Sequence, residues 1–489
     1  MRFSELLEAA EVQAFQRRGD AEVTAVASDS RRCGSGCCFV AVLGWNDDGH
    51  KYLPAALAAG GAAVVCQDPS GVPDGFPCAV VADTREAVGR LAQAILGWPS
   101  RKLVNIGVTG TKGKSTVTYL IRAVLERAGH KAALLGTIHY ETGRRVIPAS
   151  NTTPGPVELA ELCDEMVREG KDHLVMEVSS HALDQRRTSG VEFRVGVFTN
   201  LTGDHLDYHK TMEQYGRAKR LLFEQLPPHG AAVINRDDPA GAQMAEGTPA
   251  RVVWYGLSPA ADVWARIERI DAAGTRFVLM HDGGEIPVTT PLIGRHNVYN
   301  CLAAAGACAS LGVSPSDIAA GLGSVARVPG RMERVGVPAS YQVFVDYAHT
   351  DDAMEKALSS IRPLAGRELI VVFGCGGDRD RTKRPRMGRV AAKLADRVFV
   401  TSDNPRSEKP EAIIEEILAG MDESARAKTL VEPDRRAAIE SAVASAAPGD
   451  IIVIAGKGHE TYQIIAQRRI HFDDAEVAAD CMRRREGLA

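Results

Sequence analysis

The chain contains 489 residues, of which 45% are hydrophobic and 25% are charged, and its formal net charge at pH 7 is -4. This length predicts several domains, each with its own hydrophobic core. The weak net charge excludes a bulk electrostatic attraction to nucleic acid or to a membrane surface. The first 20 residues include acidic side chains and no long apolar run, so we expect no secretory signal, no membrane insertion and a cytoplasmic location.

Ten cysteines are scattered along the chain, and Cys33, Cys37 and Cys38 form the only cluster in the sequence. No second pair of cysteines and no histidines follow them at the spacing of zinc ligands. We therefore interpret the cysteines as reduced thiols, with a structural zinc site as the alternative.

Apolar runs typical of strands alternate with helical periodicity over most of the chain, which predicts an α/β fold of parallel sheets covered by helices. The first unit is small and mixed. Breaks near Pro99 and near residues 328–330 separate two larger units, so we expect three domains, at residues 1–98, 99–328 and 329–489. The short apolar strands of the last unit predict a Rossmann-like, doubly wound sheet.

Residues 104–129, VNIGVTGTKGKSTVTYLIRAVLERAG, have the pattern of a strand, a glycine-rich loop and an amphipathic helix that ends at Gly129. Backbone N–H groups of such a loop bind phosphates, Lys114 can bridge the β- and γ-phosphates, and Ser115 can hold magnesium. Val108 occupies the first glycine position of the common pattern, so the loop is a variant. The pattern predicts a central P-loop ATPase sheet that binds ATP and Mg²⁺, and a glycine-rich turn without chemical function is the alternative.

Polar residues also follow the next strands of the central unit. Glu177 ends the apolar run HLVMEV, and Asp204 and His205 come shortly after the run RVGVF. Ligands of such folds bind at the carboxyl edge of the sheet, where a carboxylate can hold Mg²⁺. For any single one of these residues, a capping role in a polar loop is the alternative. Lys219 lies in a predicted helix, where the pattern alone indicates a solvated lysine like its neighbour Arg220.

Three loops of the last unit have unusual content: residues 374–380 (GCGGDRD), 402–406 (SDNPR) and 456–460 (GKGHE). We expect all three to open on the same edge of the sheet. Arginines there can bind carboxylates, while Asp403 and Glu460 can accept hydrogen bonds from an ammonium group, which describes a pocket for a zwitterionic amino acid. The alternatives are ordinary ion pairs between loops and a dinucleotide site, for which GCGGDRD lacks the G-x-G-x-x-G spacing.

Ten motifs together resemble the Mur ligase family: TGTKGKST, NTTP, MEVSSHAL, TNLTGDHLDYH, GRHNVYN, GRMERV, DYAHT, GCGGDRD, DNPR and AGKGHE. The resemblance spans nearly the whole chain. DNPR is the most specific of these motifs. It is similar to the tetrapeptide of the members that add diaminopimelate, whereas members that add lysine usually differ at these positions. The resemblance implies an N-terminal domain for a uridine nucleotide, a central ATPase and a C-terminal Rossmann-like domain for the incoming amino acid.

The resemblance also implies roles for individual residues. A UDP-N-acetylmuramoyl dipeptide would contact the loop of residues 44–46 and the following side chains: Ser28, Ser30, Asn151, Thr152, Thr153, Ser179, Gln185 and Arg187. ATP would contact Gly110, Thr111, Lys112, Gly113, Lys114, Ser115, Thr116, Asn297, Arg331 and Asp346. Diaminopimelate would contact Arg379, Asp403, Asn404, Pro405, Arg406, Gly456 and Glu460, with Arg406 pairing with the carboxylate that lysine lacks.

The implied catalytic residues are Lys114, Glu177, His205 and Lys219. The implied magnesium ligands are Ser115, Glu177, His205 and Lys219, the last as a carbamate whose anionic charge supports a second ion. The implied reaction activates a D-glutamate side-chain carboxylate with ATP as an acyl phosphate and joins it to meso-diaminopimelate, a step of peptidoglycan precursor synthesis in the cytoplasm. We expect a monomer.

Three alternatives to this reaction remain. The first is the same ligation with L-lysine, against which DNPR argues. The second is another ligase of the superfamily, such as folylpolyglutamate synthase. The third is a P-loop ATPase or regulatory switch without ligation, against which the three C-terminal loops argue, because a switch needs no amino-acid pocket.

Overall fold

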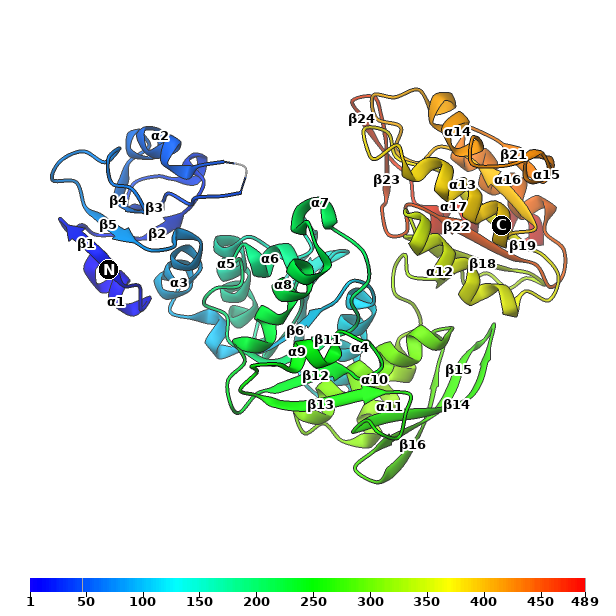
Figure 1. The fold of residues 1–489 in the computed structure, drawn as a ribbon, viewed down its shortest axis with the longest axis horizontal. Helices are drawn as coiled ribbons and strands as arrows, with labels where there is room; N and C mark the ends of the chain where they lie inside the picture. The colour runs from blue at the N-terminus through cyan, green and yellow to red at the C-terminus, as the bar shows by residue number, and fades with distance from the viewer. Residues whose placement is uncertain (46, 489) are drawn as a thin grey trace. The chain divides into compact units, whose positions relative to one another are not determined.

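The computed structural model describes residues 1–45 and 47–488 (Figure 1). These residues form two compact units. The first unit contains Met1–Ile267, Phe277–Val288 and His296–Ser324, and the second contains the remainder of the described chain. Three main sheets, each flanked by helices, confirm the predicted α/β fold class. The domain boundaries expected after residues 98 and 328 stay predictions. Within the described part of the chain, no helix combines the length and the apolar character needed to cross a membrane.

The N-terminal sheet has five strands in the order β1-β5-β4-β3-β2. β1 pairs antiparallel with β5, and the other neighbours are parallel. Buried apolar side chains of α1 and α3 cover one face, and those of α2 cover the other. The elements are α1 (Phe3–Ala9), β1 (Ala14–Arg18), β2 (Ala25–Ala27), η1 (Ser30–Arg32), β3 (Cys37–Val40), η2 (Gly49–Tyr52), α2 (Leu53–Ala58), β4 (Gly61–Cys66), β5 (Cys78–Val81), α3 (Thr84–Ile95) and the following η3 (Pro99–Lys102).

The central sheet has eleven strands in the order β16-β15-β14-β13-β12-β11-β6-β10-β7-β8-β9. β6 lies between β10 and β11 and runs parallel to both. The strands that follow β6 in the chain are therefore found on both sides of it, and the strand order reverses at β6. Ligands of open α/β sheets bind outside the carboxyl end of a strand at such a switch point. The loop that follows β6 is the predicted phosphate loop.

The elements of this sheet and its helices are β6 (Val104–Thr109), α4 (Lys114–Arg127), β7 (Ala132–Leu135), β8 (His139–Glu141), β9 (Val146–Pro148), α5 (Pro156–Arg168), β10 (His173–Glu177), α6 (Ser180–Asp184), β11 (Phe193–Phe198), α7 (Leu206–His209), α8 (Met212–Glu224), β12 (Ala231–Asn235), α9 (Gly241–Ala245), β13 (Arg251–Gly256), β14 (Val263–Asp271), β15 (Gly274–His281), β16 (Gly284–Thr290), α10 (Arg295–Ser310) and α11 (Pro315–Ser324).

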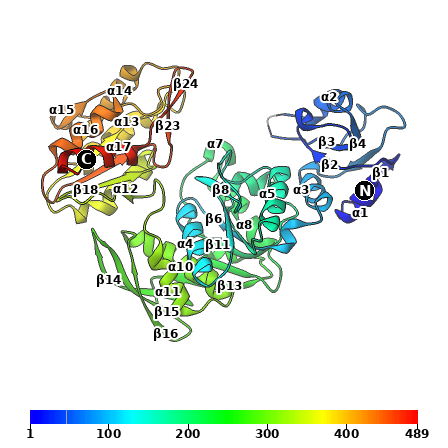
Figure 2. The same cartoon turned by 180° about the vertical axis from the view of Figure 1, so that it is seen from behind.

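The helix that starts at the phosphate loop, α4, is held by close packing against α11, and the view from behind shows the two together (Figure 2). A Cβ atom on Gly321 would lie 2.5 Å from the Cα atom of Val124, so only glycine permits this approach of the two helices. Five apolar residues that the sequence pattern placed on one face of α4 are buried: Val117, Leu120, Ile121, Val124 and Leu125. Ala128, the last residue of the pattern, follows the helix and is half-buried. The start of α4 is therefore rigidly placed at the edge of the sheet.

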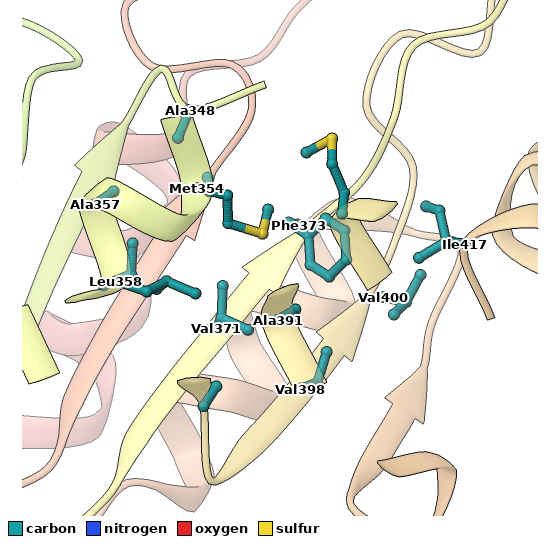
Figure 3. Close-up of a cluster of buried hydrophobic side chains, with 14 of the residues drawn as sticks. Ala348, Met354, Ala357, Leu358, Val371, Phe373, Ala391, Val398, Val400 and Ile417 are labelled. Carbon is teal, nitrogen blue, oxygen red and sulfur yellow. The ribbon is translucent and has the colours of Figure 1, made fainter. Parts of the chain in front are cut away.

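The C-terminal sheet has six strands in the order β17-β18-β22-β19-β20-β21. Successive side chains of β19 alternate between two apolar clusters on the two faces of the sheet, as a doubly covered strand requires. Figure 3 shows one of these clusters, in which Val371 and Phe373 of β19 pack beside Met354 and Leu358. β22, β19 and β20 are adjacent and parallel, so the three polar loops that follow them open on one edge, as predicted.

The elements of the C-terminal sheet and its helices are β17 (Glu333–Arg334), β18 (Gln342–Asp346), α12 (Asp351–Ile361), η4 (Arg362–Leu364), β19 (Leu369–Phe373), α13 (Lys383–Leu394), β20 (Arg397–Val400), α14 (Pro410–Leu418), α15 (Glu423–Ala427), β21 (Thr429–Val431), α16 (Arg435–Ser445), β22 (Ile451–Ala455) and α17 (Asp474–Glu486), with β23 (Tyr462–Ile465) and β24 (Arg468–His471) in a separate hairpin.

Candidate functional site

The phosphate loop joins β6 to α4 and turns on two glycines with positive φ, Gly110 (144°) and Gly113 (88°). A Cβ atom on Gly110 would lie 1.8 Å from the Thr199 hydroxyl oxygen, so a larger residue cannot occupy this position. The Lys114 ammonium donates hydrogen bonds to the carbonyl oxygens of Gly110 (2.9 Å) and Thr111 (3.0 Å). Lys114 therefore lies across the loop that a phosphate would enter.

Two residues after β11 fix the shape of this loop. The Thr199 hydroxyl donates to the Lys112 carbonyl (2.7 Å), and the Asn200 side chain both accepts from the Lys112 N–H (3.0 Å) and donates to its carbonyl (3.0 Å). The Thr111 N–H also donates to the Asn200 carbonyl. Thr199 and Asn200 were not among the predicted site residues, although both lie in the motif TNLTGDHLDYH.

Lys219 lies on α8 against the same loop, and its side chain is buried, with 1% of the residue exposed. Its Nζ donates to the Gly110 carbonyl (3.0 Å) and lies 4.3 Å from the centre of the Tyr215 ring. Burial, followed by the nearby charge of Lys114, holds the pKa of Lys219 well below the usual value of a lysine. The expectation of a solvated lysine is therefore wrong, because a helical period does not tell which side of α8 faces the neighbouring loop.

Glu177 ends β10, directly beside β6, and only 2% of it is exposed. Its carboxylate accepts hydrogen bonds from the Thr137 N–H (2.9 Å) and the Thr137 hydroxyl (3.0 Å). The Thr137 hydroxyl also lies 3.1 Å from that of Thr152. Each carboxylate oxygen has lone pairs left beyond these two bonds, so the group can still accept a ligand. Thr137 was not among the predicted site residues, because no motif or periodicity around it in the sequence indicates a contact with Glu177.

Three histidines and a tyrosine gather near the carboxyl end of β11. The His181 ring lies 4.9 Å from that of His205, 5.3 Å from that of His209 and 4.3 Å from that of Tyr208, measured between centroids. Burial, the largest cause in each case, lowers the pKa values of His205, His209 and His181, the last to about 4. Burial therefore favours the neutral form of all three imidazoles, in which a ring nitrogen can bind a metal.

Several residues expected to bind the muramoyl dipeptide form one hydrogen-bond network beside Glu177. The Thr153 hydroxyl donates to the Glu177 carbonyl (2.9 Å) and accepts from the Ser179 N–H (3.0 Å). The Arg187 guanidinium donates to the Thr153 carbonyl (3.2 Å) and to the side-chain oxygen of Gln185 (2.7 Å). Asn151 bonds to Tyr140 instead, because its carbonyl accepts from the Tyr140 hydroxyl.

The expected uridine end of the site lies in the N-terminal sheet. A cavity of about 270 Å³ is lined by Leu43, Gly44, Trp45, Gln67, Ala82, Asp83 and Arg85. Gly44 was predicted to contact the nucleotide, whereas Ser28 and Ser30 are not among the residues that line this cavity. Asn46, the last residue of the predicted loop, lies outside the described residues.

Asn297 and Asn300 on α10 adjoin the phosphate loop. The Asn300 amide donates to the side-chain oxygen of Asn297 (2.9 Å), and a Cβ atom on Gly113 would lie 2.6 Å from the Asn300 side-chain oxygen. Asn300 therefore lies between Asn297 and Gly113 of the phosphate loop. Asn300 was not among the predicted site residues.

Arg331 and Asp346 belong to the second compact unit. The Asp346 carboxylate accepts from the N–H groups of Met332 (2.8 Å) and Ala348 (2.9 Å). The Arg331 guanidinium lies 5.3 Å from the centre of the Tyr347 ring. The segment of Arg331 and Met332, which precedes β17, therefore lies against the carboxyl end of β18.

The three C-terminal loops converge, as predicted. The Asn404 amide donates to Glu460 Oε2 (2.8 Å), which joins the loop after β20 to the loop after β22. A Cβ atom on Gly456 would lie 3.5 Å from Asp403 Oδ2. Asp403 Oδ1 is buried and has no hydrogen-bond partner among the described residues, and the Lys457 ammonium lies 3.5 Å from it.

The two predicted pocket arginines lie at the loop after β19. The Arg406 guanidinium donates to the Gly377 carbonyl (2.7 Å), and a Cβ atom on Gly376 would lie 3.0 Å from Arg406 Nη1 and 3.7 Å from Arg379 Cγ. Arg406 itself has a positive φ of 52°, a strained backbone conformation for a residue with a side chain. Pro405 precedes it in the loop after β20, and the Pro405 carbonyl would lie 1.9 Å from a Cβ atom on Gly377.

Comparisons with known proteins agree with this arrangement. Family models described as the Mur ligase middle domain and as the Mur ligase, glutamate ligase domain match residues 108–308 and 330–458. The UDP-N-acetylmuramoyl-L-alanyl-D-glutamate--2,6-diaminopimelate ligase of Geobacter metallireducens is 47% identical, with 94% of each chain covered. The enzyme with the same description from Geobacillus kaustophilus is 46% identical over 96% of each chain.

A solved structure described as a UDP-N-acetylmuramoyl-L-alanyl-D-glutamate--2,6-diaminopimelate ligase superimposes with a TM-score of 0.72 at 31% sequence identity, and covers 98% of this chain and 99% of its own. The family models lie on the two sheets that carry the phosphate loop and the three converging loops. The chain therefore belongs to the Mur ligase family.

Proposed function

We propose that the chain joins meso-2,6-diaminopimelate to the D-glutamate side-chain carboxylate of UDP-N-acetylmuramoyl-L-alanyl-D-glutamate, and that it converts ATP to ADP and phosphate in doing so. The observation that carries the proposal is the identity of 47% over nearly the whole length of a ligase so described. The hydrogen bonds that join Asn404 to Glu460, and Arg406 to Gly377 of the loop after β19, support it independently. We place the reaction in the cytoplasm, in peptidoglycan precursor synthesis, and propose a monomer.

The phosphate loop and the start of α4 are proposed to bind the ATP phosphates. Residues 110–116 offer backbone N–H groups and the positive end of the helix dipole. Lys114, whose ammonium now contacts two loop carbonyls, would exchange these contacts for phosphate oxygens. Asn297 on α10, together with Arg331 and Asp346, is proposed to contact the rest of the nucleotide.

Magnesium is proposed to be held by the Ser115 hydroxyl, the Glu177 carboxylate and His205. The donors present fit the ion, because two of them are oxygen atoms and His205 is kept neutral by burial. When bound, Mg²⁺ neutralises charge on the transferred phosphoryl group. Thr137 holds the Glu177 carboxylate in place through two hydrogen bonds.

Lys219 is proposed to carry a carbamate, and its surroundings favour that modification. A neutral amine attacks CO₂, and the resulting carbamic acid releases a proton to leave an anionic carbamate. Burial and the charge of Lys114 both favour the neutral amine. The anionic product would pair with the cationic Lys114 and support a second magnesium ion, and it would be better tolerated than two ammonium groups beside one loop.

The chemistry proceeds in two steps. The D-glutamate carboxylate attacks the γ-phosphorus of ATP in line, and ADP leaves, which produces an acyl phosphate. The neutral amine of diaminopimelate then attacks the acyl carbon, the tetrahedral intermediate expels phosphate, and the amine loses a proton. Lys114 stabilises the charge that develops on the phosphoryl oxygens in the first step. Thr153, Ser179, Gln185 and Arg187, already connected beside Glu177, are proposed to orient the dipeptide.

The C-terminal loops are proposed to hold diaminopimelate. Arg379 and Arg406 would bind its carboxylates, and Asp403 and Glu460 would receive its ammonium group. Arg406 would pair with the distal carboxylate that lysine lacks, so lysine would leave this charge unpaired. Asn404, Pro405 and Gly456 complete the pocket.

The experiment is phosphate release with the uridine muramoyl dipeptide and each amino acid in turn. We expect turnover with meso-diaminopimelate and little with L-lysine. Turnover with lysine but not diaminopimelate would overturn the substrate assignment. Equal ATP hydrolysis without dipeptide or amino acid would overturn the ligase and favour an ATPase or switch.

A further inference from the structure

Lys457 is a fully buried lysine that the proposed mechanism does not use. It lies in the loop after β22, and none of its side chain is exposed. Its ammonium lies 3.3 Å from the side-chain oxygen of Asn404, 3.3 Å from Glu460 Oε2 and 3.5 Å from Asp403 Oδ1. One buried cation thus contacts three of the side chains assigned to the amino-acid pocket.

The Lys457 ammonium lies between the side chains of Asp403, Asn404 and Glu460. Asn404 donates to Glu460 (2.8 Å) and accepts from the Ile464 N–H (2.9 Å), so its side chain cannot turn away. Asp403 Oδ1 has no hydrogen-bond partner among the described residues, and it forms an ion pair with Lys457 at 3.5 Å. Two carboxylates this close in a buried place repel each other unless a cation lies between them.

The charges of the pocket can be counted from its named side chains. Among the side chains assigned to the pocket, Arg379 and Arg406 are cationic and Asp403 and Glu460 are anionic, so these four balance and Lys457 adds one positive charge. The buried Arg435 nearby is paired with Asp474, so this pair adds no net charge. Diaminopimelate with its attacking amine neutral carries two carboxylates and one ammonium group, a net negative charge. Lysine in the same state carries one carboxylate and one ammonium group, and is neutral.

We propose that Lys457 is a specificity-determining residue, which gives the amino-acid pocket the single positive charge that complements diaminopimelate in its reacting state. This inference rests on the proposed function and adds a second source of discrimination to Arg406. Arg406 would recognise one carboxylate by direct contact. Lys457 sets the net charge of the pocket without touching that carboxylate, because its ammonium faces Asp403, Asn404 and Glu460.

The test is a competition assay in which the full chain receives ATP, the uridine muramoyl dipeptide and an equimolar mixture of meso-diaminopimelate and L-lysine. Mass spectrometry of the two products gives their ratio. The variant Lys457→Met removes the charge and keeps a similar volume, and Lys457→Arg keeps the charge. Lys409→Met, an exposed lysine of the same unit, is the matched control.

We expect the diaminopimelate-to-lysine product ratio of Lys457→Met to fall about tenfold or more, because the pocket loses its net positive charge. Lys457→Arg and Lys409→Met should keep the wild-type ratio. A fall of the ratio by less than about tenfold in Lys457→Met would overturn the inference. If Lys457→Met does not melt cooperatively, Lys457→Gln, which retains an amide donor for Asn404, carries the same test.

The two proposals fail in different ways. A wild-type chain that forms no diaminopimelate product overturns the proposed function and this inference with it. A wild-type chain that forms the product, beside a Lys457→Met variant with an unchanged ratio, overturns this inference alone.

Discussion

Replacement of Lys219 by alanine separates the proposed carbamate from a merely structural lysine. The side chain is buried against Gly110 at the phosphate loop, so the variant removes both the modified amine and its aliphatic stem. We expect kcat to fall by about 10²–10³-fold, the size expected when one group that stabilises transition-state charge is lost. KM for the muramoyl dipeptide should change little, because Lys219 does not contact the network of Thr153 and Arg187.

The expected effect on stability is small by comparison. Lys219→Ala removes three buried methylene groups, which at about 0.8 kcal/mol each contribute roughly 2.4 kcal/mol to the free energy of unfolding. The variant also removes an amine that burial and Lys114 disfavour in its charged form, and this gain offsets part of the loss. We therefore expect the free energy of unfolding to fall by less than about 2.4 kcal/mol.

The assay measures phosphate release at saturating substrates, with and without a small carboxylate such as formate or acetate. The carboxylate should enter the space that the stem leaves and restore activity by about tenfold or more. Arg220→Ala, the next residue on α8, is the control, since it breaks only partly exposed ion pairs to Glu224 and Glu246. Full activity of Lys219→Ala without added carboxylate would refute the reasoning.

Three other predictions concern the amino-acid pocket, the histidine cluster and a buried ion pair. Arg406→Ala should raise KM for diaminopimelate about 10²-fold while KM for ATP stays within twofold, as measured by steady-state kinetics; unchanged discrimination against lysine would contradict its role. Burial holds the pKa of His181 at about 4 against an ordinary 6.5, so the unfolded chain binds more protons between these values and stability falls as the pH falls from 6.5 to 4. Melting curves of His181→Gln should show a weaker fall over that range, whereas the exposed His229→Gln should follow wild type. Arg435→Met should cost about 3–5 kcal/mol in urea unfolding, because it leaves Asp474 as an unpaired buried charge, and Arg435→Met with Asp474→Leu should recover most of that loss.

The phosphate loop could be predicted from the sequence because its signals are local. A strand, glycines that take positive φ at Gly110 and Gly113, and an amphipathic helix from Lys114 lie within one short segment. The same holds for the strands that precede the loops of residues 374–380, 402–406 and 456–460, since parallel strands bring the following loops to one edge.

The contacts between these segments could not be predicted in the same way. Thr137 supports Glu177 from 40 residues away, and Asn404 bonds to Glu460 across 56 residues. No periodicity or spacing reports such pairs, because they depend on how strands and helices pack, which many distant side chains decide together.

Lys219 and Lys457 show most clearly what the sequence determines and what only the tertiary structure decides. The sequence by itself determined an α/β fold, a phosphate-binding loop and three polar loops at one edge of the last sheet. The tertiary structure alone decided that both lysines are buried, one beside Gly110 and the other between Asp403 and Glu460. The reason is physical: a lysine in sequence is compatible with water or with burial, and only its packed neighbours determine whether its amine keeps its charge.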